Sequence, residues 1–147
     1  MNAKQLDAST WALVFDKGDE AIAELERFAK AQRLSAAGFT AIGAFSDAVL
    51  GYFDRDRKEY DEISVDEQVE VLSLAGDVAL ADEEPKVHAH VVLGKRDGTA
   101  HGGHLLRAHV WPTLELILTE SRAELRKRHD PETGLALIDI EEDAPRA

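Results

Sequence analysis

The hydrophobic and polar positions of this chain alternate over several short segments, a pattern typical of β-strands that bury one face. In residues 113–119, for example, Leu114, Leu116 and Leu118 fall on one side of the chain and a partly polar set falls on the other. The pattern predicts strands over residues 11–15, 39–42, 48–50, 60–65, 68–76, 87–93, 113–119 and 135–138, with a bend over residues 43–46.

Residues 19–34 are the one long segment with helical periodicity, because their apolar side chains recur every three or four positions. Asp19 is placed to cap the free backbone amides at the start of this helix, and Glu20 to interact with the positive end of its dipole. A short helical turn is predicted over residues 121–128. Together these elements predict an α+β fold, in which a mostly antiparallel sheet packs against one or two helices.

The length of 147 residues fits a single domain with a sizeable core. We expect a lead-in over residues 1–9, the domain over residues 10–138 and an acidic, disordered tail over residues 139–147. The absence of cysteine excludes disulfides and thiolate ligands, and no secretory signal or membrane-spanning run is visible. We therefore expect a cytoplasmic protein that does not bind membranes.

The formal net charge of −12 opposes nonspecific binding to nucleic acid, which depends on cations that displace phosphate counterions. Three short basic clusters are the candidates for a local DNA-binding patch, and each is mixed with acidic residues. The clusters are Arg55 with Arg57 and Lys58, Lys95 with Arg96, and Arg126 with Lys127 and Arg128. Solvated turns are the simpler interpretation of all three.

A group of three histidines around a predicted hairpin carries the clearest chemical signal. His88 and His90 are two residues apart in one strand, so they point to the same face of the sheet. Asp97 and Gly98 predict a tight turn, and the strand that returns from it contains His104. The hairpin can therefore bring all three imidazoles together.

The pairing of these histidines depends on the register of the hairpin. A three-residue loop that ends at a left-handed Gly98 sets His90 opposite His104, whereas a two-residue loop would separate the two rings. Gly102 and Gly103 have no side chains to fix the pairing, and a bulge there would shift it.

Three neutral imidazoles on one face suit zinc, and an ion with three protein ligands keeps a position open for water or a substrate. We therefore predict a zinc site formed by His88, His90 and His104, the alternative being a polar patch without a metal. The other histidines lack this spacing and are expected to be structural; they are His101, His109 and His129.

Glu115 is a carboxylate with three possible roles. It lies on the partly polar side of the strand predicted over residues 113–119. It is an ordinary exposed carboxylate, a hydrogen-bond partner that orients a ligating histidine, or a polar contact between subunits. The sequence spacing does not distinguish the three roles.

The succession of several motifs resembles the PPC domain, the plants and prokaryotes conserved family, over about residues 10–138. The motifs are Ala41-Ile42-Gly43-Ala44, Val71-Leu72-Ser73-Leu74-Ala75-Gly76-Asp77, Val87-His88-Ala89-His90, Gly102-Gly103-His104-Leu105 and Thr113-Leu114-Glu115-Leu116. The resemblance implies a homotrimer and, in prokaryotic members, a zinc ion on the residues that are here His88, His90 and His104. In plants the domain follows an AT-hook that binds DNA, but this chain has no Arg-Gly-Arg hook. A trimer of chains with charge −12 would carry −36, which further disfavours direct DNA contact.

Three functions follow from these observations. The preferred one is a non-catalytic trimeric binding domain with a histidine metal site, regulatory or DNA-associated through protein partners, because no nucleophile or phosphate-binding motif occurs. The second is direct DNA binding, the label commonly given to standalone bacterial relatives. The third is a zinc-dependent hydrolase or lyase, in which the ion activates a bound water and Glu115 serves as the base.

Overall fold

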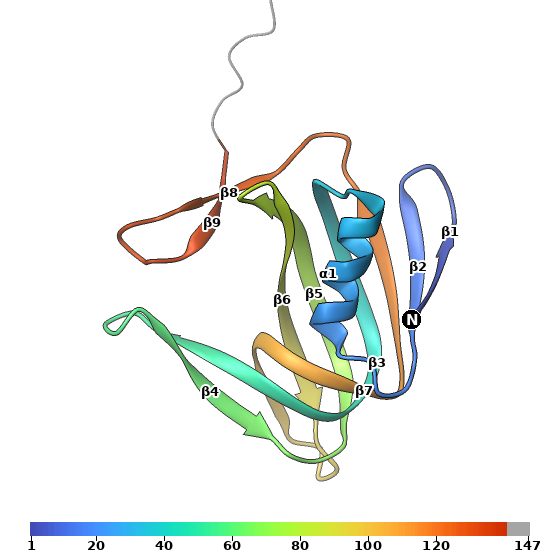
Figure 1. Ribbon diagram of the computed structural model, residues 1–147. Coiled ribbons are helices and arrows are strands. Elements are labelled where there is room, and N and C mark those ends of the chain that lie inside the picture. The colour runs from blue at the N-terminus through green and yellow to red at the C-terminus, as the bar shows by residue number, and fades with distance from the viewer. Residues whose placement is uncertain (141–147) are drawn as a thin grey trace, which may run out of the picture.

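A computed structural model describes residues 1–140 of the chain. The strands and the helix, labelled in Figure 1, are β1 (Asn2–Gln5), β2 (Thr10–Phe15), α1 (Ala21–Gln32), β3 (Ala36–Asp54), β4 (Glu59–Val65), β5 (Val69–Ala81), β6 (Glu84–Gly94), β7 (Ala100–Glu120), β8 (Arg126–His129) and β9 (Ala136–Asp139). Of the acidic tail predicted over residues 139–147, residue 139 belongs to β9, and residues 141–147 lie outside the described residues.

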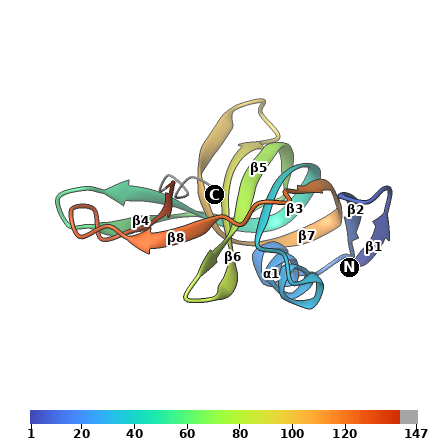
Figure 2. The ribbon, with the colours of Figure 1, turned by 90° about the horizontal axis from the view of Figure 1, so that it is seen from above.

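One antiparallel sheet dominates the fold, which confirms the predicted mostly antiparallel α+β architecture with a single helix in residues 1–140. Strands β3, β5, β6 and β7 pair in a closed ring, because β5 joins β3 to β6 and β7 joins β6 back to β3. The helix lies across one side of the sheet, as Figures 1 and 2 show from two directions. No helix in residues 1–140 is long and apolar enough to cross a membrane.

The helix is held on the sheet by its apolar side, where Leu25, Phe28 and Ala29 are buried. The ring of Phe28 packs edge-on against Trp11 of β2, with ring centroids 5.3 Å apart. Glu20, and not Asp19 as predicted, caps the helix, since its carboxylate accepts hydrogen bonds from the amides of residues 22 and 23.

The predicted bend over residues 43–46 does not divide β3 into two strands. The chain continues through a β-bulge at Gly43, where the pairing with β5 and with β7 shifts register. Gly43 has a φ of 155°, and a Cβ there would lie 2.3 Å from the carbonyl oxygen of Thr113. The strand remains continuous because its pairing with β5 and with β7 resumes beyond the bulge.

Two further segments differ from the prediction. The lead-in over residues 1–9 contains β1, which pairs with β2. Residues 121–128 form no helical turn, because residues 126–129 form β8 and pair with β9 in a small hairpin. This β8–β9 hairpin lies beside the β3–β4 hairpin in Figures 1 and 2, and Lys58 Nζ donates a hydrogen bond of 3.1 Å to the Pro131 carbonyl between them.

Candidate metal centre

The β6–β7 hairpin has the register predicted from the sequence. The Lys95 amide donates to the Thr99 carbonyl at 2.9 Å, and Gly98 closes the three-residue loop with a φ of 84°. His90 is therefore paired with His104, and no bulge interrupts the pairing of β6 with β7. The loop geometry alone sets these two histidines opposite each other.

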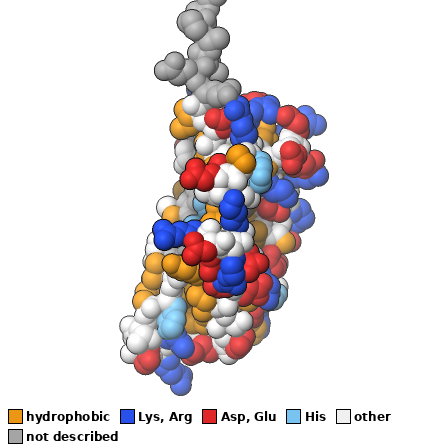
Figure 3. All heavy atoms as spheres, turned by 90° about the vertical axis from the view of Figure 1, so that its left-hand side faces the viewer, with side chains coloured by type: hydrophobic (Ala, Val, Ile, Leu, Met, Phe, Trp, Pro, Cys, Tyr) orange, Lys and Arg blue, Asp and Glu red, His pale blue; other side chains and the backbone are white. Residues whose placement is uncertain are grey.

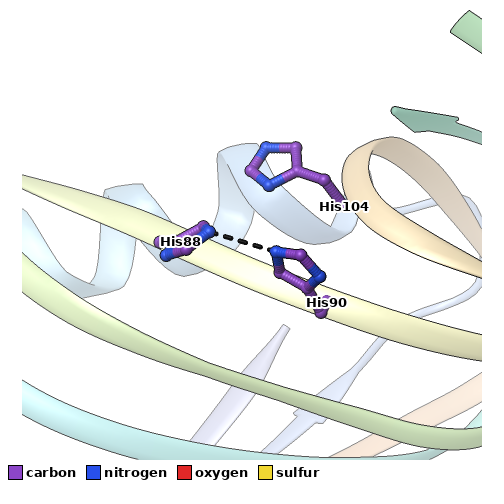
Figure 4. A group of neighbouring side chains, drawn as sticks. All are labelled: His88, His90 and His104. Carbon is purple, nitrogen blue, oxygen red and sulfur yellow. Dashed lines mark hydrogen bonds between the residues drawn. The ribbon is translucent and has the colours of Figure 1, made fainter. Parts of the chain in front are cut away.

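The three histidines point toward one another, as Figure 4 shows. The Nε2 atoms of His88 and His90 are 3.2 Å apart, and one nitrogen from each of the three rings lies within 4.8 Å of the others. Two nitrogens that each lie about 2.0–2.1 Å from a tetrahedral zinc ion are about 3.3 Å apart. The spacing between His88 and His90 thus matches that of two ligands of one ion, and a small movement of His104 would complete the set.

The surroundings of His88 and His104 favour the neutral form of the ring, which is the form that binds a metal. The pKa of His104 is lowered to about 4, mainly by burial and to a smaller extent by the neighbouring rings of His88 and His90 and by Lys127. Burial also lowers the pKa of His88, and Lys127 contributes to that shift, whereas Asp77 opposes it. Both rings therefore offer a nitrogen lone pair at neutral pH.

The ring of His104 is held in place by a side chain of β4. Tyr60 of β4 stacks on its ring, with centroids 4.7 Å apart and an interplanar angle of 25°. His104 Nδ1 is buried and has no hydrogen-bond partner in the described part of the chain. A buried ring nitrogen without a partner is costly, which is consistent with a site completed by a bound group.

Asp77 of β5 is the carboxylate that lies beside the cluster. Its Oδ2 atom is 3.5 Å from His88 Nδ1, on the side of the ring away from His90 Nε2, and its Oδ1 atom is 3.4 Å from Lys127 Nζ. A carboxylate behind a ligating imidazole orients the ring and raises its basicity. Lys127 comes from β8, so a side chain of the β8–β9 hairpin contacts the carboxylate that supports the cluster.

Sequence reasoning missed both Asp77 and Lys127. Asp77 is paired with His88 across a two-residue turn formed by Asp82 and Glu83, both with positive φ. Counting back from that turn would have found the pair, but an Asp-Glu turn lacks the glycine or asparagine that marks such hairpins.

Glu115 lies in another part of the sheet, eleven residues beyond His104 on β7. It is paired with Val14 and Ile42, and it is exposed. Glu115 is therefore too far along the strand to orient a ligating histidine or to act as a base at the cluster, the two roles that place it beside the histidines.

The remaining histidines lie apart from the cluster. His101 is paired with Leu93 and exposed, and His129 lies on β8. His109 Nδ1 is 2.8 Å from Asp47 Oδ1, and Asp47 also accepts a hydrogen bond from Ser46. These contacts agree with the structural roles expected from the sequence.

Comparison with protein families gives one match. The model of the Plants and Prokaryotes Conserved (PCC) domain matches residues 3–122. This range contains all three histidines of the cluster. The comparison with curated proteins yields no match.

Several solved structures resemble the chain over nearly its full length. A "putative dna binding protein" from Bacteroides thetaiotaomicron is 25% identical, with a TM-score of 0.90, and the match covers 94% of this chain and 96% of that one. A plant- and prokaryote-conserved (PPC) protein from Pyrococcus horikoshii is 31% identical, with a TM-score of 0.85 and coverages of 96% and 95%. A metal-containing protein from Archaeoglobus fulgidus is 35% identical, with a TM-score of 0.83 and coverages of 95% and 99%.

Proposed function

Because the chain belongs to the Plants and Prokaryotes Conserved domain family, we propose that it is a non-catalytic, homotrimeric binding domain that holds zinc through His88, His90 and His104. Its role is to bind partner molecules, and the metal stabilises the site at which β6 and β7 meet. The observation that carries the proposal is the convergence of three imidazole nitrogens within 4.8 Å of one another.

Three further observations support the metal site. The relative from Archaeoglobus fulgidus, 35% identical over nearly the whole chain, is a metal-containing protein. Three imidazoles without a thiolate or a ligating carboxylate form a donor set that suits zinc among the common divalent ions. The contact between Asp77 and His88 is of the kind that accompanies zinc-binding histidines.

An exposed apolar area on the side of the sheet away from α1 supports self-association. We call it the outer patch; it consists of Val14, Ile42, Leu72 and Ile117. Ile42 is 63% exposed, and the pairings of β2, β3 and β7 place residues 14, 42 and 117 on one face. Exposed apolar side chains gathered on one face, here on either side of Glu115, are typical of an interface. The family resemblance implies a homotrimer, and we propose that the other two copies of the chain cover this patch.

Direct DNA contact is the weaker proposal, although two of the structural relatives carry a DNA-binding name. On the face drawn in Figure 3, lysine and arginine side chains are interspersed with aspartate and glutamate. The basic clusters of the sequence are also largely paired with carboxylates: Arg57 contacts Asp54, Glu59 and Asp61, Lys95 contacts Glu67, and Arg126 contacts Glu83 and Glu124. Such pairs leave little free positive charge for phosphates.

Native mass spectrometry of untagged protein tests the proposal, since one spectrum gives both the number of subunits and the bound metal. We expect three chains with close to one zinc ion per chain. Ile42→Asp should yield monomers that keep their zinc, because it adds charge to the outer patch and leaves the histidines intact. Ile63→Asp, at an exposed apolar position of β4, should remain trimeric. A metal-free spectrum of wild-type protein would contradict the zinc site, and a monomeric wild type would contradict the trimer.

The pH dependence of zinc retention provides a separate prediction. A free histidine takes up its proton near pH 6.5 and then cannot ligate. Since the pKa of His104 is lowered to about 4, protons compete with zinc at that ring only well below pH 6.5, and the pKa of His88 is shifted in the same direction. We expect zinc to be retained at pH 6 and released as the pH falls toward 4, as measured with a chromogenic chelator. Half-release near pH 6.5 would contradict the lowered values.

A further inference from the structure

A cavity of about 450 Å³ opens beside the histidine cluster. It lies between β6, the β8–β9 hairpin and the side chain of Tyr60, and two of its lining residues are His88 and His104. The other lining residues are Ala81, Lys86, Val87, Lys127, Leu135, Ala136, Leu137 and Ile138. Its volume is that of a small-molecule site, and an ion on the cluster would lie at its wall.

One side of this cavity is apolar. Leu137 and Ile138 of the β8–β9 hairpin line it and remain 44% and 38% exposed, and Val87 of β6 is partly buried against the core. Large apolar side chains that stay uncovered at the mouth of a cavity gain from contact with a hydrocarbon group. The apolar side therefore favours a ligand with a short hydrocarbon tail.

Among residues 1–140, the charged residues that line the cavity are both basic, Lys86 and Lys127. The side chain of Lys127 is only 8% exposed, and its ammonium group lies 3.4 Å from a carboxylate oxygen of Asp77, which also contacts His88. A lysine ammonium has three donors, so the contact with Asp77 leaves donors free for a ligand. A divalent ion on the histidines would add to the positive charge, so the cavity favours an anion.

The functional groups of the lining favour a carboxylate over a phosphate. Among residues 1–140, the lining contains no arginine, serine, threonine or glycine, the residues that commonly surround phosphate oxygens. A zinc ion with three histidine ligands has one open position, and Lys127 offers one ammonium group nearby. These two partners match the two oxygens of one carboxylate.

We propose that the cavity binds a small organic monocarboxylate, whose carboxylate contacts the metal ion and Lys127 and whose hydrocarbon tail lies against Val87, Leu137 and Ile138. The proposal rests on the metal site proposed above. It assigns the β8–β9 hairpin to ligand binding, and it makes the metal a binding group for the partner molecule.

Butyrate is the probe for this site, and isothermal titration of zinc-loaded protein is the measurement. Butyrate should bind, n-butylammonium should not, and acetate should bind about ten-fold more weakly because it lacks two methylene groups that the apolar side would cover. In cobalt-substituted protein, butyrate should also change the visible absorption spectrum, since a carboxylate enters the coordination sphere. Equal affinity for acetate and butyrate, or an unchanged cobalt spectrum, would overturn the proposed binding mode.

Variants separate this proposal from the metal site itself. In samples brought to the same zinc content, Lys127→Met should weaken butyrate binding about ten-fold or more through loss of a charge-assisted hydrogen bond. Ile138→Glu, at a partly exposed position that should not affect folding, should have a similar effect. Lys4→Met, which removes the same charge from the exposed β1, is the matched control and should bind as the wild type does.

The zinc content, measured by elemental analysis of each sample, distinguishes the two possible failures. If wild-type protein holds zinc but does not bind butyrate, or if Lys127→Met and Ile138→Glu both bind it as the wild type does, the ligand proposal is overturned and the metal site stands. If wild-type protein takes up no zinc, the metal site and the ligand proposal that rests on it are both overturned.

Discussion

His90→Ala is expected to purify without zinc. The replacement leaves two imidazoles, and the loss of one of three ligands should weaken the site on the order of 100-fold or more. His90 is exposed and has only its fellow histidines as side-chain partners among the contacts described, so the variant should keep the fold of the metal-free protein. Elemental analysis and circular dichroism measure the two properties.

His101→Ala is the matched control, because it removes an exposed histidine from the same hairpin on the opposite side of the sheet. It should retain a full complement of zinc. A His90→Ala protein that keeps its zinc would show that the cluster is not the metal site, whatever the behaviour of the control.

Gly76→Ala should destabilise the protein and weaken zinc binding together. A Cβ at Gly76 would lie 2.2 Å from the His88 carbonyl oxygen, 2.5 Å from the Phe39 ring and 3.0 Å from Ala89 Cα. Two of these atoms belong to the backbone of β6, so the strand that carries His88 and His90 would have to move away from β5. Overpacking of this kind costs about 3 kcal/mol of unfolding free energy.

Urea unfolding of metal-free protein and competitive zinc titration measure the two effects. Gly38→Ala is the control, since it adds the same methyl group on β3 next to Asp77, where the nearest atom is the Gly76 carbonyl oxygen at 4.0 Å. It should change the unfolding free energy by less than about 0.5 kcal/mol. Wild-type stability for Gly76→Ala would mean that β5 and β6 are further apart at this point than described.

The histidine cluster could be predicted from the sequence because its geometry is local. His88 and His90 share a face by strand periodicity, and the Asp97-Gly98 turn fixes the partner of His90 within a single hairpin. No long-range contact was needed.

The residues around the cluster could not be predicted in the same way. The position of Lys127 depends on how β8 packs beside β5, and a single parallel bridge, between Leu80 and Arg126, is all the strand pairing between these elements. Tyr60 reaches His104 only because β4 folds back along β3, which in turn pairs with β7. Such contacts follow from tertiary packing, on which alternation of polar and apolar residues carries no information.

The prediction of a break in β3 was wrong for a related reason. The glycine at position 43 indicates a break when it is considered alone, but in the sheet β7 bulges at the same level, between the partners of Gly43 and Phe45. Paired irregularities let both strands continue. A single sequence shows a glycine in one strand and cannot show the matching bulge in its neighbour.

The family match ends at residue 122, so the histidines lie inside the shared pattern, whereas the β8–β9 hairpin lies beyond it. The hairpin is attached to the sheet through few contacts, chiefly at Leu80, Asp77 and Lys58. On the proposed binding mode, the histidines and the apolar side of the cavity thus come from separate parts of the chain. Exchanging only this hairpin between two members of the family should change which carboxylate is bound and leave the metal site in place.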